Sequence, residues 1–161
     1  MYKRQGPYFP KTIKTSNDIK NISIPDIHDN LSYVFEAIKI TKSELKGKVP
    51  LIGFAGAPWT IFAYMIEGQG SKTFSKAKSF LYREPELSHQ LLGLITETTI
   101  AYLKAQISSG ADLVQLFDSW AGILTHQQYE EFGMKYVHKI CHAIHEAPVT
   151  CLLYTSDAAD D

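Results

Sequence analysis

Two short apolar segments without polar alternation constrain the fold more than any other feature. Residues 49–54 (VPLIGF) and 113–117 (LVQLF) are each followed by a segment with helical periodicity. Strands of parallel sheets are covered on both faces, so they carry nearly continuous apolar runs. Parallel strands also need a long crossover between them, which is usually a helix. The sequence therefore predicts an α/β protein with a parallel sheet and helices packed on it.

Helical periodicity fills most of the chain around these two runs. Apolar residues recur at three- and four-residue steps in several segments, as on the buried face of a helix. The predicted helices cover about residues 29–45, 58–67, 86–108 and 125–144, and a shorter one runs from Ser71 or Thr73 to about Tyr82. A third strand is predicted to begin at Pro148–Val149. Residues 6–25 hold three prolines and a polar stretch, which is typical of an extended surface segment.

Composition narrows the possible partners. Sixteen basic and seventeen acidic residues leave a net charge of -1, so no nucleic-acid partner is predicted. No apolar run approaches the ~20 residues of a membrane-spanning helix, and no apolar core follows residues 1–5 as in a secretory signal. Cys141 and Cys151 are too few for a disulfide framework. A cytoplasmic protein without a membrane partner is expected.

Two turns that follow the predicted strands are candidate functional loops. In residues 53–60 (GFAGAPWT), Gly53 and Gly56 allow the backbone to approach a ligand beside a helix N-terminus. The alternative is that these glycines only permit tight packing between strand and helix. In the second turn, Asp118 and Ser119 follow the strand directly, where a barrel presents side chains to its mouth. Both residues are also good caps, and from the residues alone the capping role is favoured.

Two other motifs are weaker candidates for a functional site. Residues 68–71 (GQGS) precede a helix but lack the Gly-Lys-Ser/Thr end of a phosphate-binding loop, so we interpret them as a solvent-exposed loop. His138, Cys141, His142 and His145 recur at three- and four-residue steps, which would allow a zinc pair on one helix. No glutamate is placed as in a metalloprotease helix and no third ligand is evident. A solvated helix face is the preferred interpretation, and no metal site is predicted.

Residues 50–60 (PLIGFAGAPWT), followed by Tyr64-Met65 and Glu67-Gly68, resemble the signature segment of the uroporphyrinogen decarboxylases. The resemblance continues through residues 88–92, 110–111, 115–119 and 121–122, starts at residues 6–10, and covers about 6–150 in all. It implies a partial (β/α)8 TIM barrel with about three parallel strands. Such a part leaves two strand edges unpaired and half of the barrel core facing water. Residues 1–5 and 151–161 look like non-native ends and are left out of the expected fold.

The resemblance also implies an activity. The family removes the four acetate carboxyls of uroporphyrinogen III to give coproporphyrinogen III in haem and porphyrin biosynthesis, as a homodimer, with neither metal nor organic cofactor. Tyr64 matches the family's active-site tyrosine, and Ser119 matches a serine that helps to bind the tetrapyrrole. Phe54 and Phe117 occupy strand-end positions that would line the cleft, whereas Trp120 stands where some members have histidine and receives no role.

Other residues that the family uses lie outside the matched region. These are its N-terminal arginines, its pyrrole-binding aspartate and a late histidine. Asp118 belongs to a different motif and stands where some relatives have glutamate, so it does not replace that aspartate. The resemblance therefore implies that the complete enzyme is active and that this segment alone is not.

Two further interpretations stay open. A corrinoid- or thiol-dependent methyltransferase of the same superfamily would need a zinc-binding set of histidine and cysteine at strand ends. Cys141 lies instead in a predicted helix, and Cys151 lies in the C-terminal tail. A non-catalytic binding module could use the same fold. The presence of both Tyr64 and Ser119 favours an enzyme over such a module.

Overall fold

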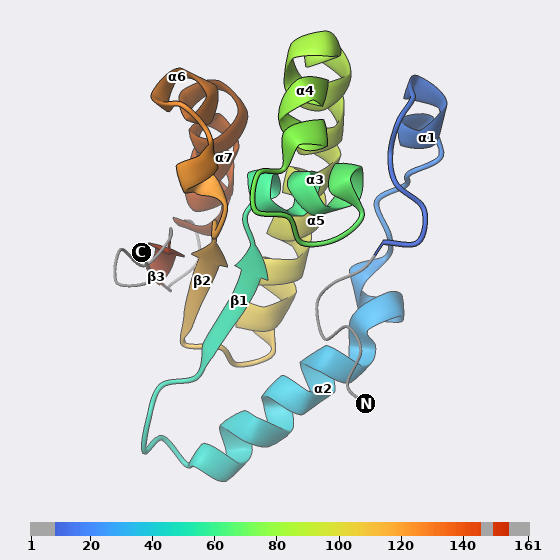
Figure 1. Ribbon diagram of the computed structural model, residues 1–161. Coiled ribbons are helices and arrows are strands. Elements are labelled where there is room, and N and C mark those ends of the chain that lie inside the picture. The colour runs from blue at the N-terminus through green and yellow to red at the C-terminus, as the bar shows by residue number, and fades with distance from the viewer. Residues whose placement is uncertain (1–8, 146–149, 155–161) are drawn as a thin grey trace, which may run out of the picture.

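The computed structural model describes residues 9–145 and 150–154, and their sheet has three parallel strands (Figure 1). The strands β1 (Ile52–Gly56), β2 (Leu113–Phe117) and β3 (Thr150–Tyr154) lie in the order β1-β2-β3. The register pairs Gly56 with Phe117 and Phe117 with Tyr154, so the carboxyl ends of the strands are level. Parallel strands with helical crossovers confirm the predicted α/β class.

The helices lie where the periodicity predicts them. They are α2 (Ile27–Leu45), α3 (Pro58–Glu67), α4 (Ser75–Arg83), α5 (Pro85–Ser108), α6 (His126–Tyr129) and α7 (Lys135–His145). Asp26 caps α2, because its side chain accepts hydrogen bonds from the amides of His28 and Asp29. Gly68 ends α3 in the left-handed region, at a φ of 89°. None of the described helices combines the length and the apolar character that a membrane span requires.

Three helical details differ from the predictions. The entry segment contains a short helix, α1 (Ser16–Lys20), because Thr15 and Asp18 form a capping box and Ile19 is fully buried. The helix α4 begins at Ser75, since the Ser71 hydroxyl accepts from the amides of Thr73 and Phe74 and so closes a turn before it. The helix predicted over 125–144 is divided by a π-helical segment, Glu130–Met134.

The third predicted strand is present. Pro148–Val149 are outside the described residues, and β3 comprises Thr150–Tyr154. Residues 151–154, which were left out of the expected fold, therefore belong to this strand. Pairing with β2 explains the strand, and the Asp118 amide extends this pairing by donating to the Tyr154 carbonyl at 2.7 Å. That residues 1–5 and 151–161 are non-native stays a prediction.

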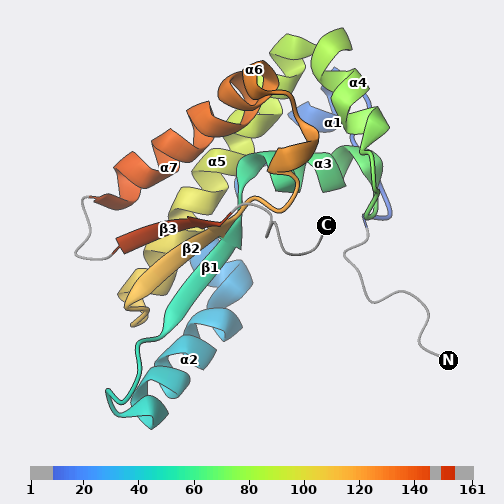
Figure 2. The ribbon, with the colours of Figure 1, turned by 60° about the vertical axis from the view of Figure 1, so that its left-hand side comes forward.

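The two faces of the sheet have different surroundings. Helices α5 and α7 lie on one face (Figure 2), where Ala55, Val114 and Leu116 are buried against them. On the opposite face the side chain of Phe54 is 61% exposed. In a closed barrel, apolar residues on this face of the sheet would point into the barrel interior. This exposed apolar face agrees with the expected open part of a barrel.

The free edge of β1 is partly closed by a side chain, which corrects the expectation of an unpaired edge. The Phe54 amide donates to Gln106 Oε1, and Gln106 Nε2 donates to the Phe54 carbonyl, both at 2.9 Å. Gln106, on α5, is buried and forms the two bonds that a neighbouring strand would otherwise form. Gly53 makes room for it, since a Cβ atom there would lie 2.5 Å from Gln106 Oε1.

Replacing Gln106 by leucine is expected to lower the free energy of unfolding by about 2 kcal/mol, because two backbone groups of Phe54 lose their partners. Urea denaturation followed by circular dichroism measures this change. The matched control is Gln90→Leu on the same helix, because Gln90 is exposed and the change there is expected to stay within about 0.5 kcal/mol. Equal midpoints for the two variants would contradict the role of Gln106.

Candidate active site

The turns after β1 and β2 lie side by side at the carboxyl end of the sheet. The register places Gly56 opposite Phe117, and the Ala57 amide donates to the Phe117 carbonyl at 2.8 Å. The first turn enters α3, with Pro58 in its first turn, and the second contains residues 118–122. In parallel α/β proteins this end of the sheet carries the functional side chains. The two loops predicted from the sequence are thus brought together.

Asp118 joins these two turns from inside the protein. Its fully buried carboxylate accepts hydrogen bonds from the Thr60 hydroxyl at 2.8 Å and from the Tyr129 hydroxyl at 2.9 Å. The Thr60 oxygen in turn accepts from the Trp120 amide at 3.4 Å. The capping role favoured for Asp118 is therefore wrong, because the carboxylate connects three separate segments. Burial raises the pKa of Asp118 above its ordinary value, against the lowering effect of its hydrogen bonds.

The raised pKa of Asp118 predicts a pH-dependent stability. The unfolded carboxyl ionises near its ordinary pKa of 3.8, whereas the folded one stays protonated to higher pH. Its contribution to the free energy of unfolding is fully present below pH 3.8 and is lost as the pH rises through the raised pKa. Urea titrations from about pH 3 to pH 7 should therefore show Asp118→Asn gaining stability relative to the wild type.

Asp112 provides the opposite control. Hydrogen bonds from the Leu51 amide and from Lys42 lower the pKa of Asp112 below its ordinary value. Its contribution is present above pH 3.8 and is lost as the pH falls, so Asp112→Asn should lose stability relative to the wild type toward neutral pH. If the stability difference from the wild type changed with pH in the same direction for both variants, the raised pKa of Asp118 would be contradicted.

Tyr64 meets the second turn through Trp120. Tyr64 is half-buried, and its phenol oxygen accepts a hydrogen bond from the Trp120 indole at 3.1 Å. The Trp120 carbonyl accepts from the Trp59 indole at 2.8 Å, and the Phe74 ring lies 4.7 Å from the Trp120 ring and 5.6 Å from the Tyr64 ring. Sequence reasoning gave Trp120 no role. The only sequence feature that could have indicated a role was its position directly after Ser119, with an indole N–H that can donate a hydrogen bond.

The other three predicted residues border the open side of the same region. Ser119 is exposed on the turn next to Trp120. Phe54 and Phe117 lie on the exposed face of the sheet with their ring centroids 5.8 Å apart in an edge-to-face arrangement. The Tyr154 ring, which sequence reasoning did not include, lies 5.5 Å from Phe117. The structure thus brings Phe54 and Phe117 together and joins the loops of Tyr64 and Ser119. The roles expected of these four residues stay predictions.

The candidate metal ligands lie elsewhere. His138, His142 and His145 are exposed on α7, which agrees with a solvated helix face. The thiols of Cys141 and Cys151 lie 4.0 Å apart, and Cys151 is in the amino-terminal half of β3, away from the carboxyl ends of the strands. Among residues 9–145 and 150–154, no three His, Cys, Asp or Glu side chains are grouped to hold a metal ion.

Comparison with known proteins identifies close sequence relatives. The family model described as uroporphyrinogen decarboxylase (URO-D) matches residues 1–160. The uroporphyrinogen decarboxylase of Christiangramia forsetii is 52% identical over 145 residues, which are 89% of this chain and 42% of the relative. That of Schizosaccharomyces pombe is 50% identical over 145 residues, or 89% of this chain and 40% of the relative. The chain thus spans about two fifths of the length of these relatives.

A solved structure has the same fold. A methyltransferase from Methanosarcina mazei superposes with a TM-score of 0.74 over 96% of this chain and 42% of its own length. The two sequences are 19% identical, so the likeness concerns the fold alone. It agrees with the expectation that the three strands and their helices are part of a TIM barrel.

Proposed function

Because this chain belongs to the uroporphyrinogen decarboxylase family, we propose that the complete gene product, of which residues 6–150 are a segment, decarboxylates the four acetate side chains of uroporphyrinogen III to give coproporphyrinogen III. One observation carries the proposal beyond family membership. The indole of Trp120 links Tyr64 to the loop that bears Ser119, beside the exposed rings of Phe54 and Phe117.

The chemistry of the reaction defines what the complete site must supply. Protonation of a pyrrole carbon turns the ring into an iminium group, which accepts the electron pair released when the bond to the carboxylate breaks. Carbon dioxide leaves, and a proton added to the methylene carbon gives a methyl group. Loss of the first proton from the ring carbon then restores the pyrrole. The substrate is its own electron sink, so the protein must supply proton transfer, stabilise positive charge and hold several carboxylates.

The proposed roles follow from the surroundings of each side chain. The Tyr64 oxygen accepts from Trp120, which leaves the phenol proton free to be donated to the substrate. The exposed hydroxyl of Ser119 would bind a carboxylate of the tetrapyrrole. The rings of Phe54 and Phe117 form an apolar surface for the flat macrocycle. From the family resemblance we also propose a cytoplasmic homodimer without a nucleic-acid or membrane partner.

A product analysis tests the proposal. The complete gene product is incubated with uroporphyrinogen III under reducing, anaerobic conditions, and the products are oxidised and separated by chromatography. We expect stepwise loss of acetate carboxyls ending at coproporphyrin III. Unchanged substrate, with a protein that is folded by circular dichroism, would refute the proposed activity, and methyl transfer to a thiol would favour the methyltransferase interpretation.

Trp120 is proposed to position Tyr64. Trp120→Phe keeps an aromatic ring against Phe74 but removes the indole donor, so kcat is expected to fall about fivefold with KM little changed. Trp120→His restores a ring N–H and is expected to recover part of the loss. Equal kcat for the wild type and Trp120→Phe, measured by the same product analysis, would contradict this role.

A further inference from the structure

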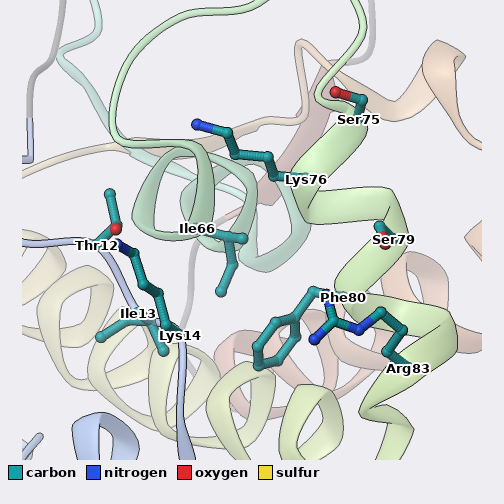
Figure 3. Close-up of a pocket in the computed structure, with 9 residues that line it drawn as sticks. All are labelled: Thr12, Ile13, Lys14, Ile66, Ser75, Lys76, Ser79, Phe80 and Arg83. Atoms are coloured by element: carbon teal, nitrogen blue, oxygen red, sulfur yellow. The ribbon is translucent and has the colours of Figure 1, made fainter.

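A hollow lies away from these loops, between the N-terminal segment and α4. It has a volume of about 550 Å³ and is shown in Figure 3. Its walls come from residues 12–14 on one side and from α4 on the other, with Ile66 of α3 between them. Tyr64, Ser119, Phe54 and Phe117 are not among its lining residues. The hollow is therefore separate from the proposed catalytic region.

The charged residues that line this hollow are all basic. Lys14 comes from the N-terminal segment, and Lys76 and Arg83 come from α4 (Figure 3). No aspartate or glutamate lines it, and within the described part of the chain none of these three cations has a carboxylate oxygen within 4.0 Å. The nearest carboxylates that the structure shows bind backbone amides and not these side chains: Asp18 accepts from the Lys14 amide at 3.1 Å, and Glu67 accepts from the Lys76 amide.

A carboxylate that does not line the hollow already accepts hydrogen bonds from the first turn of α4. Glu67 Oε2 accepts from the backbone amides of Lys76 and Ala77 at 3.1 and 3.3 Å. The Glu67 carboxylate thus satisfies free backbone donors of the helix. An incoming anion would accordingly be bound by side chains, and the argument below rests on those side chains and not on the helix terminus.

Hydroxyl groups and an apolar floor complete the lining. Ser75, Ser79 and Arg83 follow at four-residue steps and so share one face of α4. The floor is formed by Ile13, Ile66 and Phe80, which are 8%, 6% and 7% exposed. Serine hydroxyls and cations bind carboxylate or phosphate oxygens, whereas the floor offers apolar contact to the rest of a ligand.

Backbone hydrogen bonds hold the N-terminal wall in place. The Ile13 amide donates to the Met65 carbonyl at 3.0 Å, and the Phe9 amide donates to the Gly68 carbonyl at 2.8 Å. Both bonds tie this segment to the last turns of α3. The hollow is therefore formed without a ligand, so binding would not have to order these walls.

We propose that this hollow binds a small polyanion whose carboxylate or phosphate groups are attached to an apolar body. The three cations and two serine hydroxyls hold the anionic groups, and the apolar floor holds the body. Trimesate (benzene-1,3,5-tricarboxylate) has this chemistry and serves as the probe. Isothermal titration calorimetry with the complete gene product is expected to show saturable binding that weakens as salt is added.

Charge-matched variants test the site. The triple change Lys14→Gln, Lys76→Gln and Arg83→Gln is expected to weaken trimesate binding about tenfold. The matched control changes three exposed lysines outside the lining of the hollow, and its affinity should stay within about twofold of the wild type. These control changes are Lys11→Gln, Lys20→Gln and Lys72→Gln.

Two control ligands and one further variant distinguish the possible outcomes of the titration. Inorganic phosphate without an apolar body and benzene-1,3,5-trimethanol without charge should each bind at least about tenfold more weakly than trimesate. If both triple variants lost the same trimesate affinity, or if neither lost any, the proposed site would be refuted. Ser119→Ala should leave trimesate binding unchanged, and a loss there would place the probe in the proposed catalytic region instead. Failure of decarboxylation would leave this result intact, because the two regions share no residue.

Discussion

Tyr64→Phe in the complete enzyme is expected to lower kcat/KM for uroporphyrinogen III about 100-fold. The change removes one oxygen, which accepts the hydrogen bond of Trp120 and, in the proposed mechanism, donates a proton to the substrate. Phenylalanine retains the ring that packs edge-to-face against Phe74, so the surrounding structure should be kept. Initial rates of carboxyl loss, measured by chromatography of the oxidised porphyrins, provide the readout.

The control for this prediction is Tyr33→Phe. It removes the same atom from a tyrosine that is 69% exposed on α2, far in sequence from the candidate loops. Its kcat/KM is expected to equal that of the wild type within about twofold. If Tyr64→Phe also stays within that range, Tyr64 takes no part in proton transfer, although the chain would still belong to the family.

Trp59→Ala is expected to produce the largest loss of stability, about 4 kcal/mol in the free energy of unfolding. The Trp59 side chain is fully buried and stacks on Phe62, with ring centroids 5.7 Å apart. Its indole also donates to the Trp120 carbonyl, so the change leaves a cavity and removes the partner of that carbonyl. Urea denaturation followed by fluorescence and circular dichroism measures the effect.

Tyr33→Ala is the matched control for Trp59→Ala. It also truncates an aromatic ring to a methyl group, but at an exposed position, and is expected to change stability by about 0.5 kcal/mol or less. Because Trp59 holds the loop of Ser119 through Trp120, the Trp59 variant should lose catalytic activity even below its unfolding transition. Full activity of a folded Trp59→Ala protein would show that the loop keeps its position without this bond.

Local sequence patterns predicted most of the secondary structure, because such a pattern depends only on residues that are close together in the chain. The periodicity of α2 and α5 and the apolar run of β2 needed no information from elsewhere in the chain. The extent of the strand β3 was not predicted, because it depends on pairing with β2. The short helix α1 was missed because the polar residues of its capping box also suit a loop.

The candidate site was predicted as residues but not as a structure. The motifs that resemble the family pointed to Tyr64 and Ser119, and the register of β1 and β2 then placed their loops next to each other. The role of Trp120 could not be derived, because its hydrogen bond to Tyr64 joins residues that are 56 positions apart. The bonds of Asp118 to Thr60 and Tyr129 also depend on packing.

The sequence by itself determined the α/β class, the positions of its main helices and strands, and the identity of the two loops that follow β1 and β2. These properties depend on local periodicity and on short motifs, which are complete within each segment. Only the tertiary structure decided that Gln106 closes the edge of β1, that Asp118 is buried, and that three cations surround one hollow. Each of these features needs side chains from distant segments to meet, and the distances between such segments are set by packing alone.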